Sequence, residues 1–148
     1  MCKVSNFDST AGFKICSQNW KKNSLIAQYL NITIMNTHRY TPQLIVENKD
    51  YLCFNIPLYQ RLFAWGESQV YGLLYDMKEH FSKTGKEEPY YLGMLSCIAR
   101  GNVYDLIDGQ QRFTVMTLLA LVLRKYDERW NKFLDEGKRL HFAARPKD

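Results

Sequence analysis

The sequence has few of the residues that hold metal ions or covalent cross-links. Its four cysteines are far apart and include no Cys-x-x-Cys pair, and its three histidines are scattered among them. These residues are Cys2, Cys16, Cys53, Cys97, His38, His80 and His141. Zinc sites usually draw on closely spaced cysteines and histidines, so the sequence predicts no metal site of this kind. Cys53 and Cys97 fall in expected strands and are predicted to be buried thiols.

The sequence also lacks the apolar segments that secretion and membrane insertion require. The start, Met1 to Val4, shows no apolar stretch of the secretory kind. The longest apolar run, Val115 to Leu123, is interrupted by Thr117 and is far shorter than the roughly 18 residues of a membrane-spanning helix. Together with cysteines that form no disulfide pattern, these absences predict a cytoplasmic protein with no membrane partner.

The sequence shows no internal repeat, low-complexity tract or His-Asn-His nuclease motif. What it does have is an ordinary globular composition. Of its 148 residues, 46% are hydrophobic, which predicts a single folded domain rather than a disordered chain. The formal net charge of +5 is a mild basic bias that is compatible with a nucleic-acid partner but is not evidence for one.

A polar turn between an expected strand and an expected apolar helix is the most informative part of the chain. β-favouring residues over 103–107 predict the strand, and helix-favouring residues follow from Thr114 to Tyr126. Between them stands the run Asp108-Gly109-Gln110-Gln111-Arg112. Asp108 is expected to cap the helix, with Gln111 reaching back as in a capping box.

This turn has two interpretations. In the first, Gly109 gives a ligand close access to backbone amides, and the helix dipole and the Arg112 guanidinium favour a phosphate. In the second, the turn is a well-satisfied polar loop without a ligand, because capping boxes are mostly structural. The turn is not the phosphate loop of P-loop enzymes, because no Gly-Lys-Ser/Thr follows it.

A second polar and aromatic turn lies upstream, after an expected strand over Tyr51 to Ile56. It is the run Ile56-Pro57-Leu58-Tyr59-Gln60-Arg61-Leu62-Phe63-Ala64-Trp65. Tyr59 and Trp65 offer broad aromatic faces, and Gln60 and Arg61 offer hydrogen-bond donors, so this turn would stack on a base or hold a phosphate. Alternatively, the aromatic side chains close the edge of the sheet and Arg61 pairs with a carboxylate.

In their order and spacing, the motifs of this chain resemble a known family. The pattern Ile-Pro-x-Tyr-Gln-Arg-x-aromatic-x-Trp is followed by Tyr90-Tyr91-Leu92-Gly93 and then by Ile-Asp-Gly-Gln-Gln-Arg-x-Thr. This arrangement resembles the N-terminal domain of GmrSD-type, modification-dependent restriction enzymes, a prokaryotic family related in fold to the ParB and sulfiredoxin group. The resemblance covers about Thr41 to Trp130.

The resemblance implies a site for a nucleoside triphosphate, with or without Mg²⁺. It makes Asp108 and Gln111 the expected catalytic residues, with Asp108 acting as a base or helping to position a metal, or else only capping the helix. The expected nucleotide- and phosphate-binding residues are Arg112, Gln110, Gly109, Arg61, Gln60 and Tyr59. In some members the Tyr-Gln-Arg element is linked to sensing modified DNA.

The resemblance also implies partners outside this chain. In the family, DNA cutting is usually assigned to a separate C-terminal nuclease domain, so the chain is expected to be an N-terminal fragment that acts with such a domain or subunit. Two positions depart from the family pattern, since many relatives have proline at the place of Leu62 and tyrosine at the place of Phe63. The ring of Phe63 keeps a stacking face but lacks the hydroxyl.

The expected fold is α+β, with a small mixed β-sheet packed against two main helices, ParB/sulfiredoxin-like. The main helices are expected over Gly66 to Ser82 and Gln110 to Trp130, and strands near Cys53, Leu95 and Leu106. Shorter expected elements are a helix at Ser24 to Tyr29, a strand at Ile32 to Met35, a helix starting at Thr41-Pro42, a hairpin around Arg100-Gly101-Asn102 and a strand at Arg139 to Phe142. Residues 1–40 are expected to form a partly ordered N-terminal arm, and residues 41–148 the nucleotide-binding domain.

The predicted function is therefore that of a nucleotide-binding and nucleotide-hydrolysing regulatory domain in a DNA-modification-dependent restriction protein. The alternative is a non-catalytic module that recognises modified DNA or a nucleotide. A third interpretation is a scaffold domain that only joins partner subunits.

Overall fold

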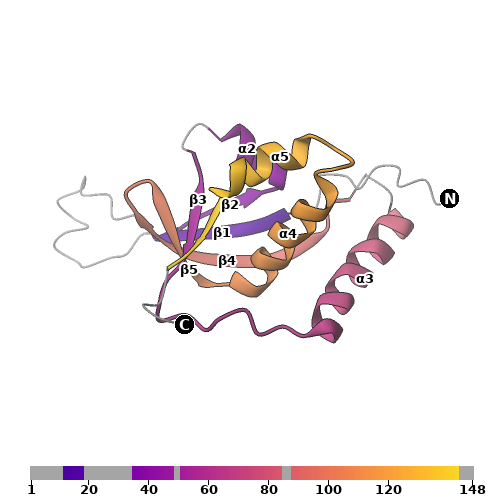
Figure 1. Ribbon diagram of the computed structural model, residues 1–148, viewed down its shortest axis with the longest axis horizontal. Helices are drawn as coiled ribbons and strands as arrows, with labels where there is room; N and C mark the ends of the chain where they lie inside the picture. Colours follow the sequence, from indigo (N-terminus) through magenta and orange to yellow (C-terminus); the bar gives the residue numbers. More distant parts are fainter. Residues whose placement is uncertain (1–11, 19–34, 49–50, 85–87, 144–148) are drawn as a thin grey trace.

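Within residues 12–18, 35–48, 51–84 and 88–143, which the computed structural model describes, six strands form one mixed sheet (Figure 1). The strands are β1 (Gly12–Gln18), β2 (Met35–Tyr40), β3 (Cys53–Ile56), β4 (Tyr91–Arg100), β5 (Val103–Asp108) and β6 (Leu140–Phe142). The helices are α2 (Pro42–Glu47), α3 (Glu67–Thr84), α4 (Gln110–Leu123) and α5 (Arg129–Leu134), with a 3₁₀ turn (Asp135–Gly137) after α5. The expected α+β class is confirmed.

The strands follow the order β2-β1-β4-β5-β3-β6 across the sheet. β1 pairs with β2 and β4 pairs with β5 in antiparallel fashion, whereas the pairs β1–β4, β3–β5 and β3–β6 are parallel. Parallel neighbours need long crossover connections, and the segments that carry α3 and α4 supply them. The mixed sheet expected from the sequence is confirmed, and it is larger than the three strands named there.

Strand β1 is an element that the sequence analysis did not predict within residues 1–40. Its residues lie inside the sheet, between β2 and β4, with Lys14 paired to Met94 and to Arg39. The strand depends on partners far away in the sequence, so the local composition of residues 12–18 did not predict it. The division of the chain at residue 40 stays a prediction. The helix expected at Ser24 to Tyr29 lies outside the described residues.

Several local predictions are confirmed. Helix α2 begins at Pro42, and the Thr41 hydroxyl caps it by accepting a hydrogen bond from the Leu44 amide at 3.1 Å. The hairpin of β4 and β5 turns at Gly101, whose φ of +60° suits glycine. Cys53 and Cys97 are buried free thiols, as predicted.

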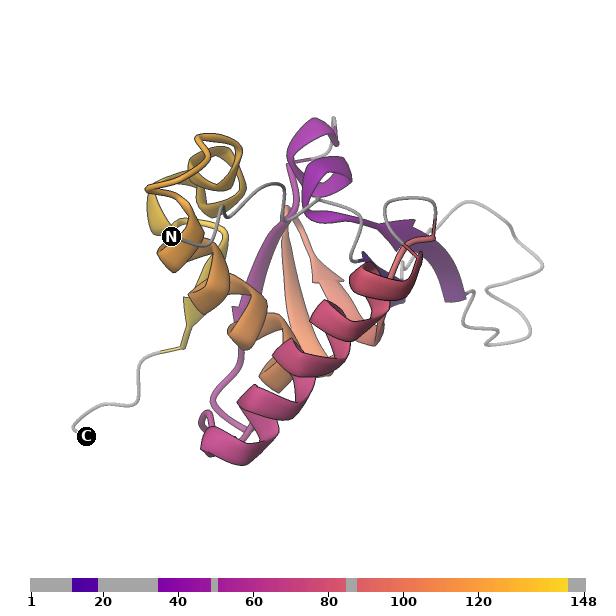
Figure 2. The same cartoon turned by 90° about the vertical axis from the view of Figure 1, so that its right-hand side faces the viewer.

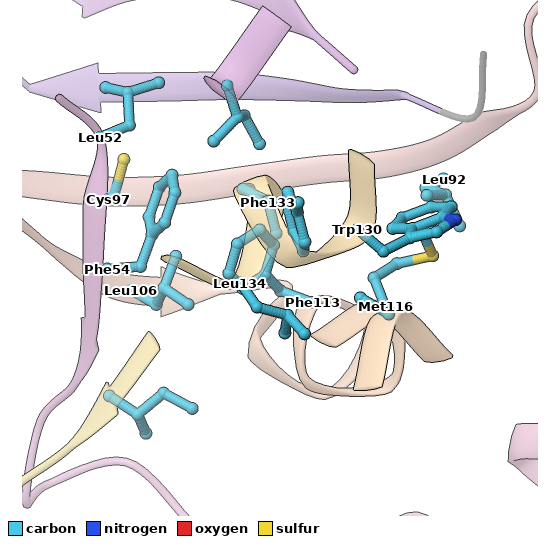
Figure 3. Close-up of a cluster of buried hydrophobic side chains, with 14 of the residues drawn as sticks. Leu52, Phe54, Leu92, Cys97, Leu106, Phe113, Met116, Trp130, Phe133 and Leu134 are labelled. Atoms are coloured by element: carbon cyan, nitrogen blue, oxygen red, sulfur yellow. The ribbon is translucent and has the colours of Figure 1, made fainter. Parts of the chain in front are cut away.

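The hydrophobic core joins the sheet to the helices (Figure 3). The Phe54 ring of β3 lies 4.7 Å from the Phe113 ring of α4, centroid to centroid, and Phe113 in turn meets Phe133 of α5. Side chains of α2 and α3, Ile45 and Met77, complete the same cluster and are almost fully buried. Burial of this apolar surface is the main stabilising contribution, at about 2 kcal/mol for each large side chain.

The long helix expected from Gln110 to Trp130 is interrupted. α4 ends at Leu123, and α5 begins at Arg129 after a turn. In that turn the Asp127 carboxylate accepts a hydrogen bond from the Arg129 amide at 2.9 Å, a local bond that competes with continued helix. The break lets α5 pack Trp130 and Phe133 into the core beside α2, at the top of Figures 1 and 2.

The second half of α4 is buried on one face only. Phe113, Met116 and Ala120 are at most 1% exposed, but Leu118, Leu121 and Val122 are 47%, 41% and 56% exposed.

Helix α3 lies along one side of the molecule, away from α2 and α5 (Figure 2). Its Met77 side chain is buried in the core, while Leu73, Leu74 and Phe81 are partly buried against it. In the described part of the chain, every helix is too short or too polar to cross a membrane.

Candidate functional site

The Asp108 to Arg112 run forms the junction between β5 and α4. Asp108 ends the strand, Gly109 adopts a left-handed conformation with φ +84°, and the helix begins at Gln110. The capping box expected here is wrong, because Gly109 occupies the cap position and makes no side-chain cap bond to the described helix. The Gln111 side chain does not reach back to Asp108, because it is bonded to the loop described below.

Gly109 is pressed against β4. A Cβ atom at this position would lie 2.5 Å from Leu95 Cδ2 and 2.6 Å from the Met94 carbonyl oxygen. Any other residue would clash there and would also be strained at this positive φ. The close approach fixes the start of α4 against the middle of the sheet.

Gln111 holds the second motif in place. Its Oε1 accepts hydrogen bonds from the amides of Ala64 and Trp65 at 2.9 and 3.2 Å, and its Nε2 donates to the Leu62 carbonyl at 3.2 Å. Gln111 is only 6% exposed, so these bonds are made away from solvent. The two motifs are therefore in contact, through the Gln111 side chain and the loop backbone.

Two further glutamines tie the same loop to the junction. Gln110 Nε2 donates to the Arg61 carbonyl at 3.1 Å, and Gln60 Nε2 donates to the Ile107 carbonyl at 3.0 Å. The backbone from residue 60 to 65 is therefore held at several points by side chains of both motifs. A loop held in this way presents its own side chains in defined positions.

The side chains of Tyr59 and Arg61 face solvent from this held loop. Tyr59 is 65% exposed, and Arg61 is also exposed. Within the described residues, neither side chain makes a hydrogen bond or an ion pair, so the core role for Tyr59 and the carboxylate partner for Arg61 considered above are not seen. Both groups are available to a ligand.

Gln110 carries an unusual buried atom. The residue is 6% exposed, and its Oε1 has no hydrogen-bond partner among the described residues. A buried acceptor without a donor costs roughly 1–3 kcal/mol, so such atoms call for an explanation. The atom lies at the first residue of a helix whose N-terminal amides have no side-chain cap.

Arg112 makes contacts that the sequence did not predict. Its guanidinium donates to the carbonyl oxygens of Leu92 and Met94, at 3.0 and 3.2 Å. Gly93, between those two residues, has a φ of +110° and leaves room for the guanidinium. Arg112 thus holds β4 to α4, which also explains the glycine of the Tyr-Tyr-Leu-Gly motif. Its phosphate-binding role stays a prediction.

Two carboxylates of β5 differ in their surroundings. Asp108 is exposed and, within the described residues, its carboxylate makes no hydrogen bond or ion pair. Asp105 is buried, and its carboxylate accepts hydrogen bonds from Asn55 Nδ2 at 2.7 Å and from Arg100 Nε at 2.5 Å. This buried cluster could not be predicted from the sequence, because Asn55 is fifty residues from Asp105 and the three residues form no motif. Asp105 is a structural residue, whereas Asp108 is free to meet a ligand.

The described residues contain no group of three or more histidine, cysteine or acidic side chains arranged to hold a metal ion. Mg²⁺ in nucleotide sites commonly uses one or two carboxylates together with phosphate oxygens and water. Asp108 fits such a minimal role, because it is a single unpaired carboxylate beside the start of α4.

A pocket of about 310 Å³ lies elsewhere, between α2 and α5. Its lining residues are Pro42, Gln43, Val46, Glu47, Asp127, Arg129, Trp130, Lys132 and Phe133. Hydrogen bonds from the Arg129 side chain hold the pKa of Asp127 below its ordinary value. Figures 1 and 2 place α2 and α5 at the opposite end of the molecule from the start of α4, so this pocket is separate from the two motifs.

Comparison with known proteins identifies the family. A family model described as the N-terminal domain of the GmrSD restriction endonuclease matches residues 43–148. No curated protein and no solved structure matches the chain. The matched range begins inside α2 and includes both motifs and the junction of β5 and α4.

Proposed function

The chain belongs to the family of GmrSD restriction endonuclease N-terminal domains, and from this premise we propose that its β5–α4 junction binds the phosphates of a nucleoside triphosphate and supports their hydrolysis. In this proposal the domain regulates a cytoplasmic restriction system that responds to modified DNA. The nuclease activity belongs to a C-terminal domain or partner subunit.

One observation carries the proposal. The first turn of α4 has no side-chain cap, and beside it the buried Gln110 Oε1 has no donor among the described residues. Uncapped helix amides attract anions, since the amides and the helix dipole both favour negative charge. A bound phosphate would supply an anion for the amides. The water that attacks it would donate a hydrogen bond to Gln110 Oε1.

The neighbouring side chains suit the same ligand. Arg61 would contribute a guanidinium to the phosphates, and Tyr59 an aromatic face to the base. Gln60 and Gln111 would act by holding the loop that carries them. Arg112, bonded to β4, would add its remaining N–H groups to the anion site.

The catalytic roles follow from which polar atoms are still free. Gln110 Oε1 would accept a hydrogen bond from the attacking water and orient it, a role that glutamines take in other nucleotide hydrolases. Asp108 would act as the base or hold Mg²⁺, which would shield the charge on the phosphates. Gln111 is less suited to the catalytic role expected for it, because both polar atoms of its side chain already bond to the loop.

Two further parts of the proposal, the fold relationship and the DNA partner, rest on the family and not on the geometry of the site. The fold would be ParB/sulfiredoxin-like, and the partner would be DNA, contacted through the complete restriction protein. The net charge of +5 is compatible with such a partner.

Nucleotide binding is tested by calorimetric titration of the protein with ATP and with GTP, each with Mg²⁺. Arg61→Ala is expected to weaken binding by about tenfold or more, since one charge-assisted contact is worth about 1.5–3 kcal/mol. The matched control is Arg124→Ala, which removes an exposed arginine just after the far end of α4. Equal affinity in the parent and in Arg61→Ala would contradict the assigned site.

Hydrolysis is tested separately by phosphate release. Under the proposal, Gln110→Ala lowers the rate of release far more than it lowers nucleotide affinity. If nucleotide binds and no phosphate is released, the domain is instead the non-catalytic recognition module. If neither nucleotide changes the melting temperature, the scaffold interpretation is favoured.

A further inference from the structure

Leu118, Leu121 and Val122 form an exposed apolar strip, named here the α4 stripe. Their spacing of i, i+3 and i+4 places them on one face of the helix, and they are 47%, 41% and 56% exposed. The other face of α4 is fixed in the core through Met116 and Ala120, at most 1% exposed. The stripe is therefore a rigid apolar surface rather than a set of mobile side chains.

The same side of α4 is covered where the helix begins. Gln111 lies seven residues before Leu118, which is about two helical turns, so the two residues point the same way. At Gln111 the loop of residues 62–65 lies over the helix, bonded to its side chain. One turn further along, Thr114 and Val115 are still buried, and about two turns from Gln111 the helix face becomes exposed at Leu118.

We propose that the α4 stripe is the docking face for an amphipathic helix with acidic residues beside its apolar positions. Helices pack by fitting apolar side chains spaced by three and four residues into one another, and the α4 stripe has this spacing. Two basic residues, Arg124 and Lys125, follow the stripe directly and are exposed. They complement carboxylates on the incoming helix.

A second copy of this chain is a poor occupant. The α4 stripe has only three residues, against the roughly 20–30 residues that each partner contributes to a stable complex. Two copies would also bring Arg124 and Lys125 of each chain together, on proteins that each carry a net charge of +5. A contact this small is stable when the partner helix is tethered nearby, as in another part of the same enzyme.

The probe is a synthetic, fluorescently labelled helical peptide with leucine at i, i+3, i+4 and i+7 and glutamate at the flanking positions. A second peptide carries lysine in place of each glutamate. Fluorescence anisotropy gives the Kd of each peptide for the protein. The acidic peptide is expected to bind about tenfold tighter or better than the basic one. Equal binding of the two peptides overturns the proposal.

Variants locate the contact. Val122→Glu is expected to weaken binding of the acidic peptide by about tenfold or more, because it places a carboxylate in the apolar contact. Leu44→Glu, at a residue of α2 that is 46% exposed, is the matched control and leaves the Kd unchanged. An equal loss of affinity for the acidic peptide in both variants contradicts the assignment of the contact to the α4 stripe. A parent dimer in sedimentation that Val122→Glu converts to monomer assigns the face to a second copy and also overturns the proposal.

Discussion

The guanidinium of Arg112 lies against Gly93 and bonds to the carbonyl oxygens on both sides of it, those of Leu92 and Met94. A Cβ at Gly93 would lie 1.6 Å from Nη1 of Arg112, and the φ of Gly93 is +110°. The glycine of one motif and the arginine of another thus form a single structural unit. This unit sets the position of the first turn of α4, where the nucleotide is proposed to bind.

Replacing this glycine is therefore expected to destabilise the protein. Gly93→Ala should lower the free energy of unfolding by about 3 kcal/mol, from backbone strain and displaced Arg112 bonds. The measurement is urea denaturation followed by circular dichroism. Gly72→Ala is the matched control, because a Cβ there meets nothing within 4 Å and the position is helical. The control should be stabilised by about 0.5–1 kcal/mol. Similar changes in the two variants would refute the steric argument.

Loss of Gln111 should free the loop that it holds. In Gln111→Ala the amides of Ala64 and Trp65 lose their acceptor and should exchange with deuterium about tenfold faster or more, since a lost bond is worth about 1 kcal/mol or more. Gln110→Ala is the comparison, because Gln110 bonds to a carbonyl of the loop and to none of these amides. Mass spectrometry of the peptide containing residues 62–65 reports the rates. Unchanged exchange in Gln111→Ala would show that the loop is held by other contacts.

Arg139 is a buried cation bonded to backbone carbonyls, and within the described residues it forms no ion pair with a carboxylate. It is 4% exposed, and its guanidinium donates to Phe133, Leu52 and Lys132 and lies 5.2 Å from the Tyr51 ring centroid. Arg139→Met leaves these carbonyls without donors and should cost about 2–4 kcal/mol of stability.

The matched control for Arg139 is Arg124→Met, at an exposed position where a change of under about 0.5 kcal/mol is expected. Thermal denaturation of the three proteins gives the comparison. If Arg139→Met melts at the same temperature as the parent, water replaces Arg139 as the donor to these carbonyls.

The raised pKa of the buried Cys53 thiol predicts that the folded protein loses stability at alkaline pH. Burial raises the pKa of its thiol above the ordinary value of 9.0, and the thiol donates to the Lys138 carbonyl at 3.1 Å. An acid with a raised pKa in the folded state stabilises the fold below the unfolded pKa, and this contribution is lost as the pH rises through the folded pKa. The unfolding free energy should therefore fall above pH 9.0, and fall less steeply in Cys53→Val. Identical slopes in parent and variant would contradict this.

Signals that act over a few neighbouring residues were enough to predict much of the fold. Thr41 and Pro42 determine the start of α2 through one cap bond and one fixed dihedral, so adjacent residues sufficed. The hairpin at Gly101 is local in the same way. The convergence of the two motifs could be expected only from their joint resemblance to a family.

The features that the sequence missed depend on distant partners. β1 owes its place to pairing with β4, which lies more than seventy residues away along the chain (Gly12 opposite Tyr91). The helix predicted through Trp130 breaks because α5 gains core contacts with α2 by folding back. In the site, the bonds from Arg112 to β4 could not be predicted, because a linear motif does not show carbonyl groups of a strand elsewhere in the sequence.

The position of β1 inside the sheet has a practical consequence for anyone trimming this protein. The family match begins at residue 43, so a polypeptide cut back to that range lacks β1 and β2. Its β4 would then offer a row of unpaired amides and carbonyls to other molecules. Exposed strand edges of this kind promote aggregation, and insolubility of the shortened polypeptide would reflect a missing neighbour strand rather than a defective domain.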